Sequence, residues 1–581
     1  MNLRQHPLPF AIGALLACTC LALPAQASHR HPRPVPPDGS TTAMRASQDD
    51  NDNMPPPAPS HWPEAAGVPA GTVVQLNANT SSAMVGTWQS LIPADNPPFY
   101  PSTSLQLTNG DVMIREYGTP YWWALHPDAT GNYLKGTLTK LAPMPNGYAP
   151  LYECHAVLAD GRVVVFGGEY LFDANGNPTV AEANEGAIYD PQTNTWGSLP
   201  SLPNQPLTFP NGKVYSYKVF GGDNSCVVMP NGQLLLASNQ YYTADSALLD
   251  PKTLTWTVLH PKGLPYTHGN LENGWTLLPD GSVFTLDVED NSGYRYLPPW
   301  LDGTPNGAWI PAGTPPVQLS DPRDYEIGPG LLRPDGTVLV VPALGGNTAV
   351  YTPPTSLHGT GSWSASASLI DANGIPQGTC DGPGSVLPDG TALLIGAPEC
   401  YAPPSTYFSL DPSGTTASPL ANQPAFAAGI PTFIAFNLTL PTGQVLVGSL
   451  NEADTFTPSG SAPWDWAPVI MNSPNQVTAG TTFAISGYQF NGLTQGSYYG
   501  DDGDSFTNYP LVRVTYRPTG AVSYLRTHDH TSMGVATGST LVGTQVDIPA
   551  NMQDGPYDLV VVANGIASQS VKIQIHKSTK K

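Results

Sequence analysis

The chain contains few charged residues, and basic residues are scarcest. Asp, Glu, Lys and Arg make up 11% of its 581 residues, against about 25% in typical soluble domains. The 22 basic residues are outnumbered by 44 acidic ones, which gives a formal net charge of −22. Such a chain repels phosphate backbones, so we expect no nucleic-acid partner. The charge balance favours cations, basic partners or neutral polar ligands.

Long apolar runs are absent beyond the N-terminus. One run covers residues 9–23 and precedes Pro24-Ala25-Gln26-Ala27, a small-residue cleavage pattern. The run is short for a membrane span, which needs about 20 residues. We therefore expect residues 1–27 to be a signal peptide. Leu15-Leu16-Ala17-Cys18 offers a weaker, lipoprotein alternative. The mature chain should have no membrane span and be exported, either secreted, periplasmic or at the cell surface.

Glycine (58 residues) and proline (64 residues) are abundant instead. Both are costly inside helices and common in turns between short strands. Seven times the chain shows an apolar run, a tight turn and a second apolar run, at intervals of roughly 50 residues. Asp-Gly and Asn-Gly supply the positive φ angles that two-residue hairpins require. The turns are Asn109-Gly110, Asp160-Gly161, Asn231-Gly232, Asp280-Gly281, Asp335-Gly336, Asp389-Gly390 and Thr442-Gly443.

This repeat predicts an all-β fold. One strong hairpin per unit of about 50 residues is typical of kelch propellers. A solenoid or an array of sandwiches would leave strand edges that a closed ring removes. We expect a seven-bladed kelch-type β-propeller over residues 85–463, with Gly86–Leu91 closing the ring against the last blade. Residues 466–577, with six or seven short strands, predict an immunoglobulin-like β-sandwich. The Pro-, Asp- and Asn-rich residues 28–84 predict a largely disordered leader.

Cysteine is scarce, and two of the six cysteines leave with the signal peptide. An even count in an exported protein predicts two disulfides. Cys380 and Cys400 flank the Asp389-Gly390 turn almost symmetrically, so a hairpin would bring them opposite each other. Cys154 and Cys226 occupy similar inner-strand positions in successive repeats, and we expect them to form the second bridge.

The order of signal peptide, seven kelch blades and C-terminal immunoglobulin-like domain resembles galactose oxidase and its bacterial and fungal relatives. The resemblance covers about residues 85–577. Its more specific part lies in the C-terminal domain, which looks like the bacterial kelch branch of that family. The segments that carry it are Asn491-Gly492-Leu493-Thr494-Gln495-Gly496, Thr507-Asn508-Tyr509-Pro510-Leu511-Val512-Arg513 and Arg526-Thr527-His528-Asp529-His530-Thr531-Ser532-Met533-Gly534.

The resemblance implies a copper ion on the propeller axis, held by two tyrosines and two histidines. One tyrosine of the family is cross-linked to a cysteine. Tyr152 matches that tyrosine, and His530 matches the histidine of the C-terminal loop. The cysteine position holds Pro101, and the positions of the remaining pair hold Phe433 and Ile434. Two of four ligands remain, so copper-radical chemistry is disfavoured.

Acidic residues stand at the funnel positions of several other blades. Eight residues before each turn, the innermost strand of a blade enters the axial funnel. We take Tyr152, His530, Asp223, Glu272 and Asp381 as candidate catalytic residues. Beside them, or on the C-terminal loop, lie the candidate ligand-binding residues Glu153, His155, Glu326, His528 and Asp529. Converging carboxylates repel one another unless something compensates.

Three compensations are chemically sensible. A divalent cation such as calcium could take the oxygen ligands. Raised pKa values could create an acid/base pair, or sugar hydroxyls could donate hydrogen bonds. The alternative is that these acids only bond blade backbones or face a water-filled channel. The acidic run 501–504 lacks the spacing of an EF-hand loop and predicts a surface turn.

Three functions remain open at this stage. The favoured one is a carbohydrate-directed protein, binding or non-oxidative, with a carbohydrate or polyol ligand and a monomeric state. The alternatives are a copper-radical alcohol or aldehyde oxidase with rearranged ligands, and a non-catalytic cell-surface interaction protein. The residues alone do not decide whether the protein is an enzyme or which metal it holds. If the site assignment is right, His530 lies within one side-chain contact of Tyr152.

Overall fold

The structure of the chain is a computed structural model. It describes residues 73–75, 80–82, 86–95, 97–181, 183–203, 205–208, 214–217, 225–238, 244–265, 272–323, 325–450, 452–497, 503–505 and 507–578. The expected signal peptide and Asp223 lie outside these residues. Among them, no helix has the length and apolar character needed to cross a membrane.

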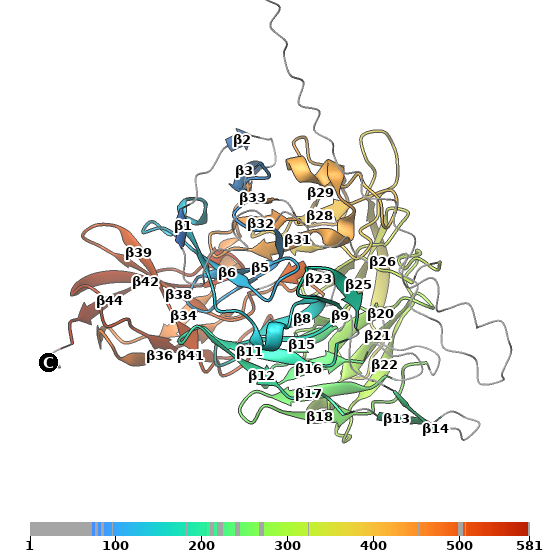
Figure 1. Cartoon of the computed structure of the whole chain (residues 1–581), viewed down its shortest axis with the longest axis horizontal. Helices are drawn as coiled ribbons and strands as arrows, with labels where there is room; N and C mark the ends of the chain where they lie inside the picture. Colours follow the sequence, from blue (N-terminus) through green and yellow to red (C-terminus); the bar gives the residue numbers. More distant parts are fainter. Residues whose placement is uncertain are drawn as a thin grey trace, which may run out of the picture.

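The described chain forms seven four-stranded antiparallel blades arranged as a propeller (Figure 1). In the first six blades the strands follow chain order from the axis outward. The seven-bladed fold expected from the sequence is confirmed. The blades are β4 (Pro101–Gln106), β5 (Val112–Glu116), β6 (Trp122–His126), β7 (Thr137–Lys140); β8 (Pro150–Val157), β9 (Val163–Phe172), β11 (Gly186–Asp190), β12 (Thr195–Leu199); β15 (Cys226–Val228), β16 (Leu234–Ala237), β17 (Ser246–Asp250), β18 (Thr255–Leu259); β19 (Thr276–Leu277), β20 (Val283–Asp287), β21 (Ser292–Leu297), β22 (Ala308–Gly313); β23 (Gly330–Leu332), β24 (Val338–Val340), β25 (Asn347–Thr352), β26 (Ser362–Ser368); β27 (Gly384–Val386), β28 (Ala392–Gly396), β29 (Thr406–Leu410), β30 (Ala417–Pro419); and β31 (Phe436–Thr439), β32 (Val445–Gly448), β33 (Ala453–Pro458), β3 (Gly86–Ile92).

Strand β3 closes the ring. It comes from the start of the described chain and pairs antiparallel with β33, so it forms the outer strand of the seventh blade. In Figure 1 this blue strand lies beside orange ones. The closure expected from the sequence is therefore confirmed, and it ties the two ends of the propeller together.

A few short elements decorate the blades. Two of them, β1 and β2, fall within the leader that the sequence predicts to be largely disordered. The added strands are β1 (Val73–Gln75) on β7, β2 (Thr80–Ser82) on β3, β10 (Pro178–Val180) on β9, and the hairpin β13 (Gln205–Thr208) with β14 (Val214–Tyr217). The helical turns are η3 (Tyr133–Lys135), η4 (Pro145–Gly147), α1 (Pro299–Asp302), η5 (Ala425–Gly429), η6 (Thr432–Ile434) and η7 (Trp464–Trp466).

Burial follows the position of a strand in its blade. The middle strand β16 reads Leu-Leu-Leu-Ala and is buried at every position, because neighbouring blades cover both of its faces. The outer strand β12 buries only its last residue fully. Apolar runs thus mark the middle strands, which lie between neighbouring blades.

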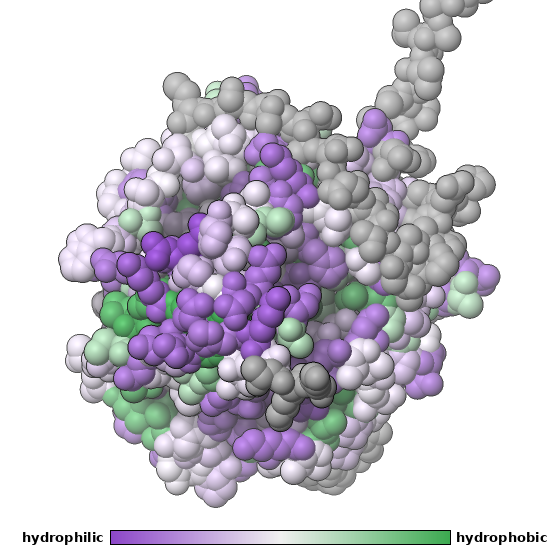
Figure 2. Space-filling view, turned by 90° about the vertical axis from the view of Figure 1, so that its left-hand side faces the viewer, coloured by the Kyte–Doolittle hydropathy of each residue, from purple (hydrophilic) through white to green (hydrophobic). Residues whose placement is uncertain are grey.

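The C-terminal residues form a β-sandwich of two sheets around one apolar core. The first sheet is β34 (Val469–Asn472), β36 (Thr482–Tyr488), β41 (Val542–Asp547) and β40 (Thr527–His528). The second is β35 (Gln476–Thr478), β44 (Val571–His576), β42 (Gly555–Ala563), β38 (Leu511–Tyr516) and β39 (Ala521–Leu525), with β43 (Ile566–Ala567) on β42. Seen from the sandwich side, hydrophilic residues dominate the middle of the surface and apolar patches lie towards its edges (Figure 2).

The sandwich docks on the hairpin-turn end of the propeller. The backbone N–H groups of Thr527, His530 and Met533 donate to carbonyls at the turns of the first three blades, namely those of Thr108, Ala159 and Pro230. The opposite end of the axis, where the inner strands begin, is called here the axial mouth.

One segment of the sandwich runs into the propeller itself. Strand β37 (Gly503–Ser505) pairs in parallel with β31, the innermost strand of the seventh blade, and contacts β4 of the first. The sequence predicted a surface turn at residues 501–504. Residues 503 and 504 instead lie in β37, so the prediction is wrong for its second half. A three-residue parallel pairing carries no periodic signal, so the sequence did not reveal it.

Both expected disulfides are present. Cys154 and Cys226 join the inner strands of blades two and three, with Cα atoms 5.9 Å apart. Cys380 and Cys400 bridge the sixth blade, with Cα atoms 5.0 Å apart. Two disulfides are compatible with an exported protein.

Candidate functional site at the propeller axis

The backbone is strained at the funnel positions. Tyr152, Glu272 and Asp381 each stand eight residues before their hairpin turns, and each adopts a positive φ, of 57°, 57° and 48°. Non-glycine residues avoid this region, and each such residue costs of the order of 1 kcal/mol or more. In β8 the strain coincides with a register shift between Leu151 and Glu153. A bulge of this kind changes the direction in which a side chain points. The positive φ at all three funnel positions is therefore consistent with side chains that are turned towards the axis.

Three of the predicted acids converge at the axial mouth. Ligand oxygens of Glu272, Glu326 and Asp381 all lie within 4.8 Å of one another. The three residues are between 1% and 3% exposed. They come from the entries to the fourth, fifth and sixth blades, so the propeller fold alone brings together residues that are far apart in sequence. We refer to them as the acid cluster.

Neighbouring polar contacts fix two members of the acid cluster. Asn273, directly after Glu272, accepts hydrogen bonds from Val288 N at 3.1 Å and from Ser225 Oγ at 2.5 Å. The N–H of Asp381 donates to the carbonyl of Ile327 at 3.1 Å, which ties the sixth blade entry to the fifth. These contacts hold the positive-φ backbone in place.

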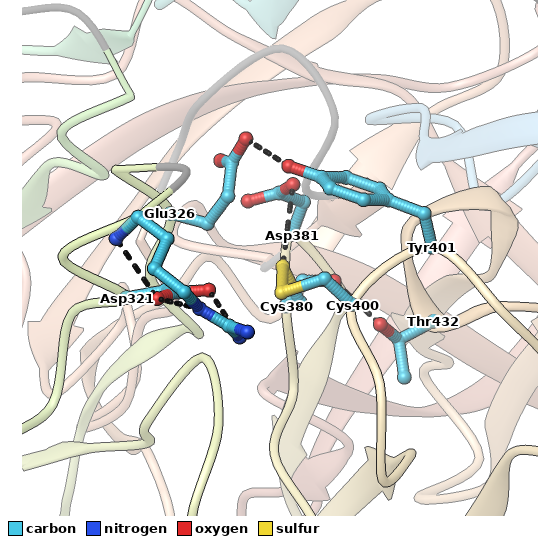
Figure 3. Close-up of a disulfide and its surroundings, with 8 residues drawn as sticks. Asp321, Glu326, Cys380, Asp381, Cys400, Tyr401 and Thr432 are labelled. Carbon is cyan, nitrogen blue, oxygen red and sulfur yellow. Dashed lines mark hydrogen bonds and ion pairs between the residues drawn. A yellow bond between two sulfur atoms is a disulfide. The ribbon is translucent and has the colours of Figure 1, made fainter. Parts of the chain in front are cut away.

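The hydroxyl group of Tyr401 donates a hydrogen bond to Oε1 of Glu326. Figure 3 shows the carboxyl groups of Glu326 and Asp381 and the Tyr401 hydroxyl pointing toward one another. Burial raises the pKa of Glu326 well above its ordinary value, and the negative charges of Asp381 and Glu272 raise it further. Burial, together with the nearby carboxylates, also raises the pKa of Tyr401. In the absence of a cation, Glu326 therefore keeps a proton over a wider pH range than an exposed glutamate.

Aromatic side chains border the acid cluster. Ring centroids of Tyr401 and Phe433 are 5.9 Å apart, and those of Phe433 and Tyr152 are 6.4 Å apart. These rings belong to one apolar group that also contains Cys380 and Cys400. The site thus has an acidic side and an aromatic side.

Glu153 and His155, predicted to bind ligand, lie on the same inner strand as Tyr152 but have protein partners. Arg115 Nη1 donates to both carboxylate oxygens of Glu153 at 2.8 Å, in a fully buried ion pair. His155 lies 3.5 Å from Thr103 Oγ1. Burial lowers the pKa of His155 to about 4, so its imidazole is neutral at neutral pH. These two residues join blades one and two.

The expected contact between His530 and Tyr152 is wrong. His530 N donates to the carbonyl of Ala159 at 3.0 Å, at the hairpin turn that follows β8, whereas Tyr152 lies near the start of β8. Seven residues of extended chain span about 23 Å. The C-terminal loop, residues 526–534, belongs to the sandwich, which docks on the turn end of the axis. The sequence similarity of this loop to the family therefore did not predict where the loop lies.

The rest of that loop also stays on the sandwich. His528 pairs with Asp547 at 3.2 Å and with Asp529 at 2.9 Å, away from the axial mouth. His530 stacks on Tyr509, and its Nδ1 lies 2.9 Å from Thr544 Oγ1. Of the predicted residues in this loop, His530 contacts the propeller, through its backbone N–H.

Sequence reasoning missed Tyr401. It is neither at a funnel position nor in a motif. The available signal is its place directly after Cys400, as Asp381 directly follows Cys380, so one disulfide sets both side chains.

Comparisons with known proteins give limited matches. No family model matches the chain. Over 73 residues, 12% of the chain, it is 37% identical to the kelch-like protein terF of Aspergillus terreus, and this stretch covers 14% of that protein's length. The chain thus spans about a seventh of that relative.

Two solved structures are similar in outline. One is a fungal alcohol oxidase of the AA5 family in complex with copper, 14% identical, covering 86% of this chain and 99% of that one, with a TM-score of 0.46. The other is the set of RRP9 WD40 repeats, 9% identical, covering 67% and 99%, with a TM-score of 0.34. The propeller itself is established by the strand pairing of this chain, and its sequence is similar to a kelch-like protein over one short stretch.

Proposed function

We propose that the acid cluster binds a divalent cation, with calcium as the preferred ion, and that the protein uses this site to bind a carbohydrate or polyol. The observation that carries the proposal is the approach of three buried carboxyl groups to within 4.8 Å. Three such groups cannot all ionise without a compensating charge. Within the part of the chain that the structure describes, no Lys or Arg is among the groups that shift the pKa of Glu326.

The spacing suits a hard cation. Calcium binds oxygen at 2.3–2.6 Å, so two oxygens on opposite sides of the ion are about 5 Å apart. Carboxylate ligands favour calcium, magnesium or manganese, whereas copper prefers imidazole and sulfur. Cation binding would replace the proton that burial keeps on Glu326.

A sugar could complete the coordination of the calcium ion and contact the aromatic side of the site. Calcium takes six to eight oxygen ligands, more than three carboxylates supply when each gives one oxygen. Vicinal hydroxyls of a polyol can complete the shell. The buried rings of Tyr152, Phe433 and Tyr401 form the apolar border on the other side.

The residues assigned to copper by the family resemblance do not fit a copper centre. Tyr152 is packed against Phe433 and Tyr170. His530 lies at the other end of the axis, and Phe433 and Ile434 offer no metal ligand. We therefore propose that the copper-radical site is degenerate and derive no oxidation step.

A metal titration tests the cation. Protein stripped with chelator is melted with added calcium, magnesium, manganese or copper. We expect calcium to raise Tm, because binding to the folded state at a hundred times Kd adds about 2.7 kcal/mol. Asp381→Asn and Glu272→Gln should abolish this rise. Asp371→Asn, in an exposed turn, is the matched control and should leave it unchanged.

The two halves of the proposal can fail separately. An unchanged Tm and no heat of binding in calorimetry for any hard cation would refute the cation site. Calcium binding without calcium-dependent retention on a glycan array would leave the cation and refute the carbohydrate role at this site. Stoichiometric copper in preference to calcium would favour the oxidase alternative.

A further inference from the structure

One tryptophan is exposed far more than the other large hydrophobic residues of the described chain. Trp464 is 88% exposed, whereas Trp300, the next tryptophan in this group, is 41% exposed. It lies in η7, on the connection between β33 of the seventh blade and β34 of the sandwich. An indole in water forfeits the favourable burial of a large apolar surface.

The connection that carries Trp464 is fixed on both sides. The neighbouring Trp466 packs its ring over the turn glycine Gly390, so close that a Cβ there would lie 2.9 Å from the ring. On the other side, Gln489 Nε2 donates to the carbonyl of Asp465 at 3.2 Å. Trp464 is therefore presented by a rigid turn, and its exposure is a property of the fold.

Beside Trp464 is a pocket of about 370 Å³ between the propeller and the sandwich. This volume is within the range of small-molecule sites, which occur preferentially between domains. Its lining comes from the turns of blades six and seven, the connection and the β42–β43 turn of the sandwich. The polar lining residues include Thr442, Gln444, Thr457 and Ser461, beside Trp464.

The lining is polar but uncharged. None of the described residues that line the pocket is Asp, Glu, Lys, Arg or His, although the chain as a whole carries a net charge of −22. Gln444 accepts from Thr442 Oγ1 at 2.9 Å and donates to Thr457 Oγ1 at 2.7 Å, which fixes its amide. Amide and hydroxyl groups beside an exposed indole match a ligand with hydroxyls on its edge and an apolar face.

We propose that this pocket is a second binding site, which takes one ring of a neutral oligosaccharide stacked on Trp464. Gln444 and the Ser461 hydroxyl contact the ring hydroxyls. The site needs no cation, and it is independent of the acid cluster in both residues and chemistry. A charged sugar finds no counter-charge there, so neutral glycans are preferred.

The test uses the purified protein on an array of neutral and acidic glycans in the presence of chelator, followed by calorimetry with the neutral hexasaccharide retained best. We expect retention of neutral glycans. Trp464→Ala should weaken binding roughly tenfold or more, because aromatic stacking and the buried face are lost together. Trp464→Phe should recover part of the affinity, and Trp300→Ala should leave it unchanged.

The outcomes separate this site from the axial one. Failure to retain any neutral glycan in chelator, or equal affinity for the protein and its Trp464→Ala variant, would overturn the second site. Loss of binding in Asp381→Asn but not in Trp464→Ala would assign the glycan to the axial mouth instead. Tm values of each variant in chelator show whether a loss of binding reflects unfolding.

Discussion

The disulfide between Cys380 and Cys400 joins the residues that directly precede Asp381 and Tyr401. Asp381 belongs to the acid cluster, and Tyr401 donates to Glu326 of the same cluster. Thr432 Oγ1 also donates to the carbonyl of Cys380. One covalent bond thus positions two side chains of the axial mouth (Figure 3).

Removing this disulfide should weaken cation binding. The double change Cys380→Ser and Cys400→Ser should cost roughly 3 kcal/mol of stability, from the closed loop it releases. It should also reduce calcium affinity at least tenfold, because Asp381 and Tyr401 lose their common anchor. Calorimetric titration and thermal melts measure the two effects.

The second disulfide is the control. Cys154→Ser with Cys226→Ser opens a longer loop, with a sequence separation of 72 against 20, and should cost more stability, roughly 4 kcal/mol. Its calcium affinity should stay near that of the unaltered protein. Equal losses of affinity in the two double variants would contradict a positioning role for Cys380 and Cys400.

The buried ion pair between Arg115 and Glu153 should matter for stability and not for ligand binding. Arg115→Met leaves a buried carboxylate unpaired, which costs about 3–5 kcal/mol. Adding Glu153→Leu should recover most of this loss, because an apolar pair needs no charge partner. Denaturant midpoints of the single and double variants measure the effect. A double variant no more stable than Arg115→Met would show that the site needs polar groups.

Closure of the propeller should depend on Trp88 of β3. Its ring is buried against Tyr407 and Phe456, and its Nε1 donates to the carbonyl of Asn422 at 3.0 Å. Trp88→Ala should cost about 3–5 kcal/mol. Trp300→Ala, at a partly exposed site, should change stability by no more than about 0.5 kcal/mol. Similar melting temperatures for the two variants would argue against β3 as the closing strand.

Acidification should weaken the docking of the sandwich through His530. Burial, together with the nearby His528 and Arg526, lowers its pKa to about 3. The unfolded chain has the ordinary value of about 6.5, so it binds the proton more readily. This group therefore removes stability as pH falls from 6.5 towards 3, by about 2 kcal/mol at pH 5.

A neutral substitution should remove this dependence. Between pH 7 and pH 5, His530→Asn should lose less stability in urea denaturation than the unaltered protein does. His260→Asn, at an exposed histidine paired with Asp245, should behave like the unaltered protein. Parallel losses in all three proteins would mean that His530 is not the group responsible.

Much of the fold could be predicted because hairpin signals are local. Asp389-Gly390 and its six counterparts mark every inner hairpin, and the strained positions Tyr152, Glu272 and Asp381 all fall at one fixed distance from their turns. The cysteine pairs followed from the same repeat. These features depend on turn chemistry and strand length, which neighbouring residues decide.

The sequence by itself therefore determined the blades, the closing strand and the acids that enter the axis. Only the tertiary structure decided which of these side chains meet. It brought Glu272, Glu326 and Asp381 together with Tyr401, paired Glu153 with Arg115, and kept His530 at the opposite end. The physical reason is that the end of the propeller on which the sandwich docks is set by packing between distant surfaces, for which a local pattern carries no signal.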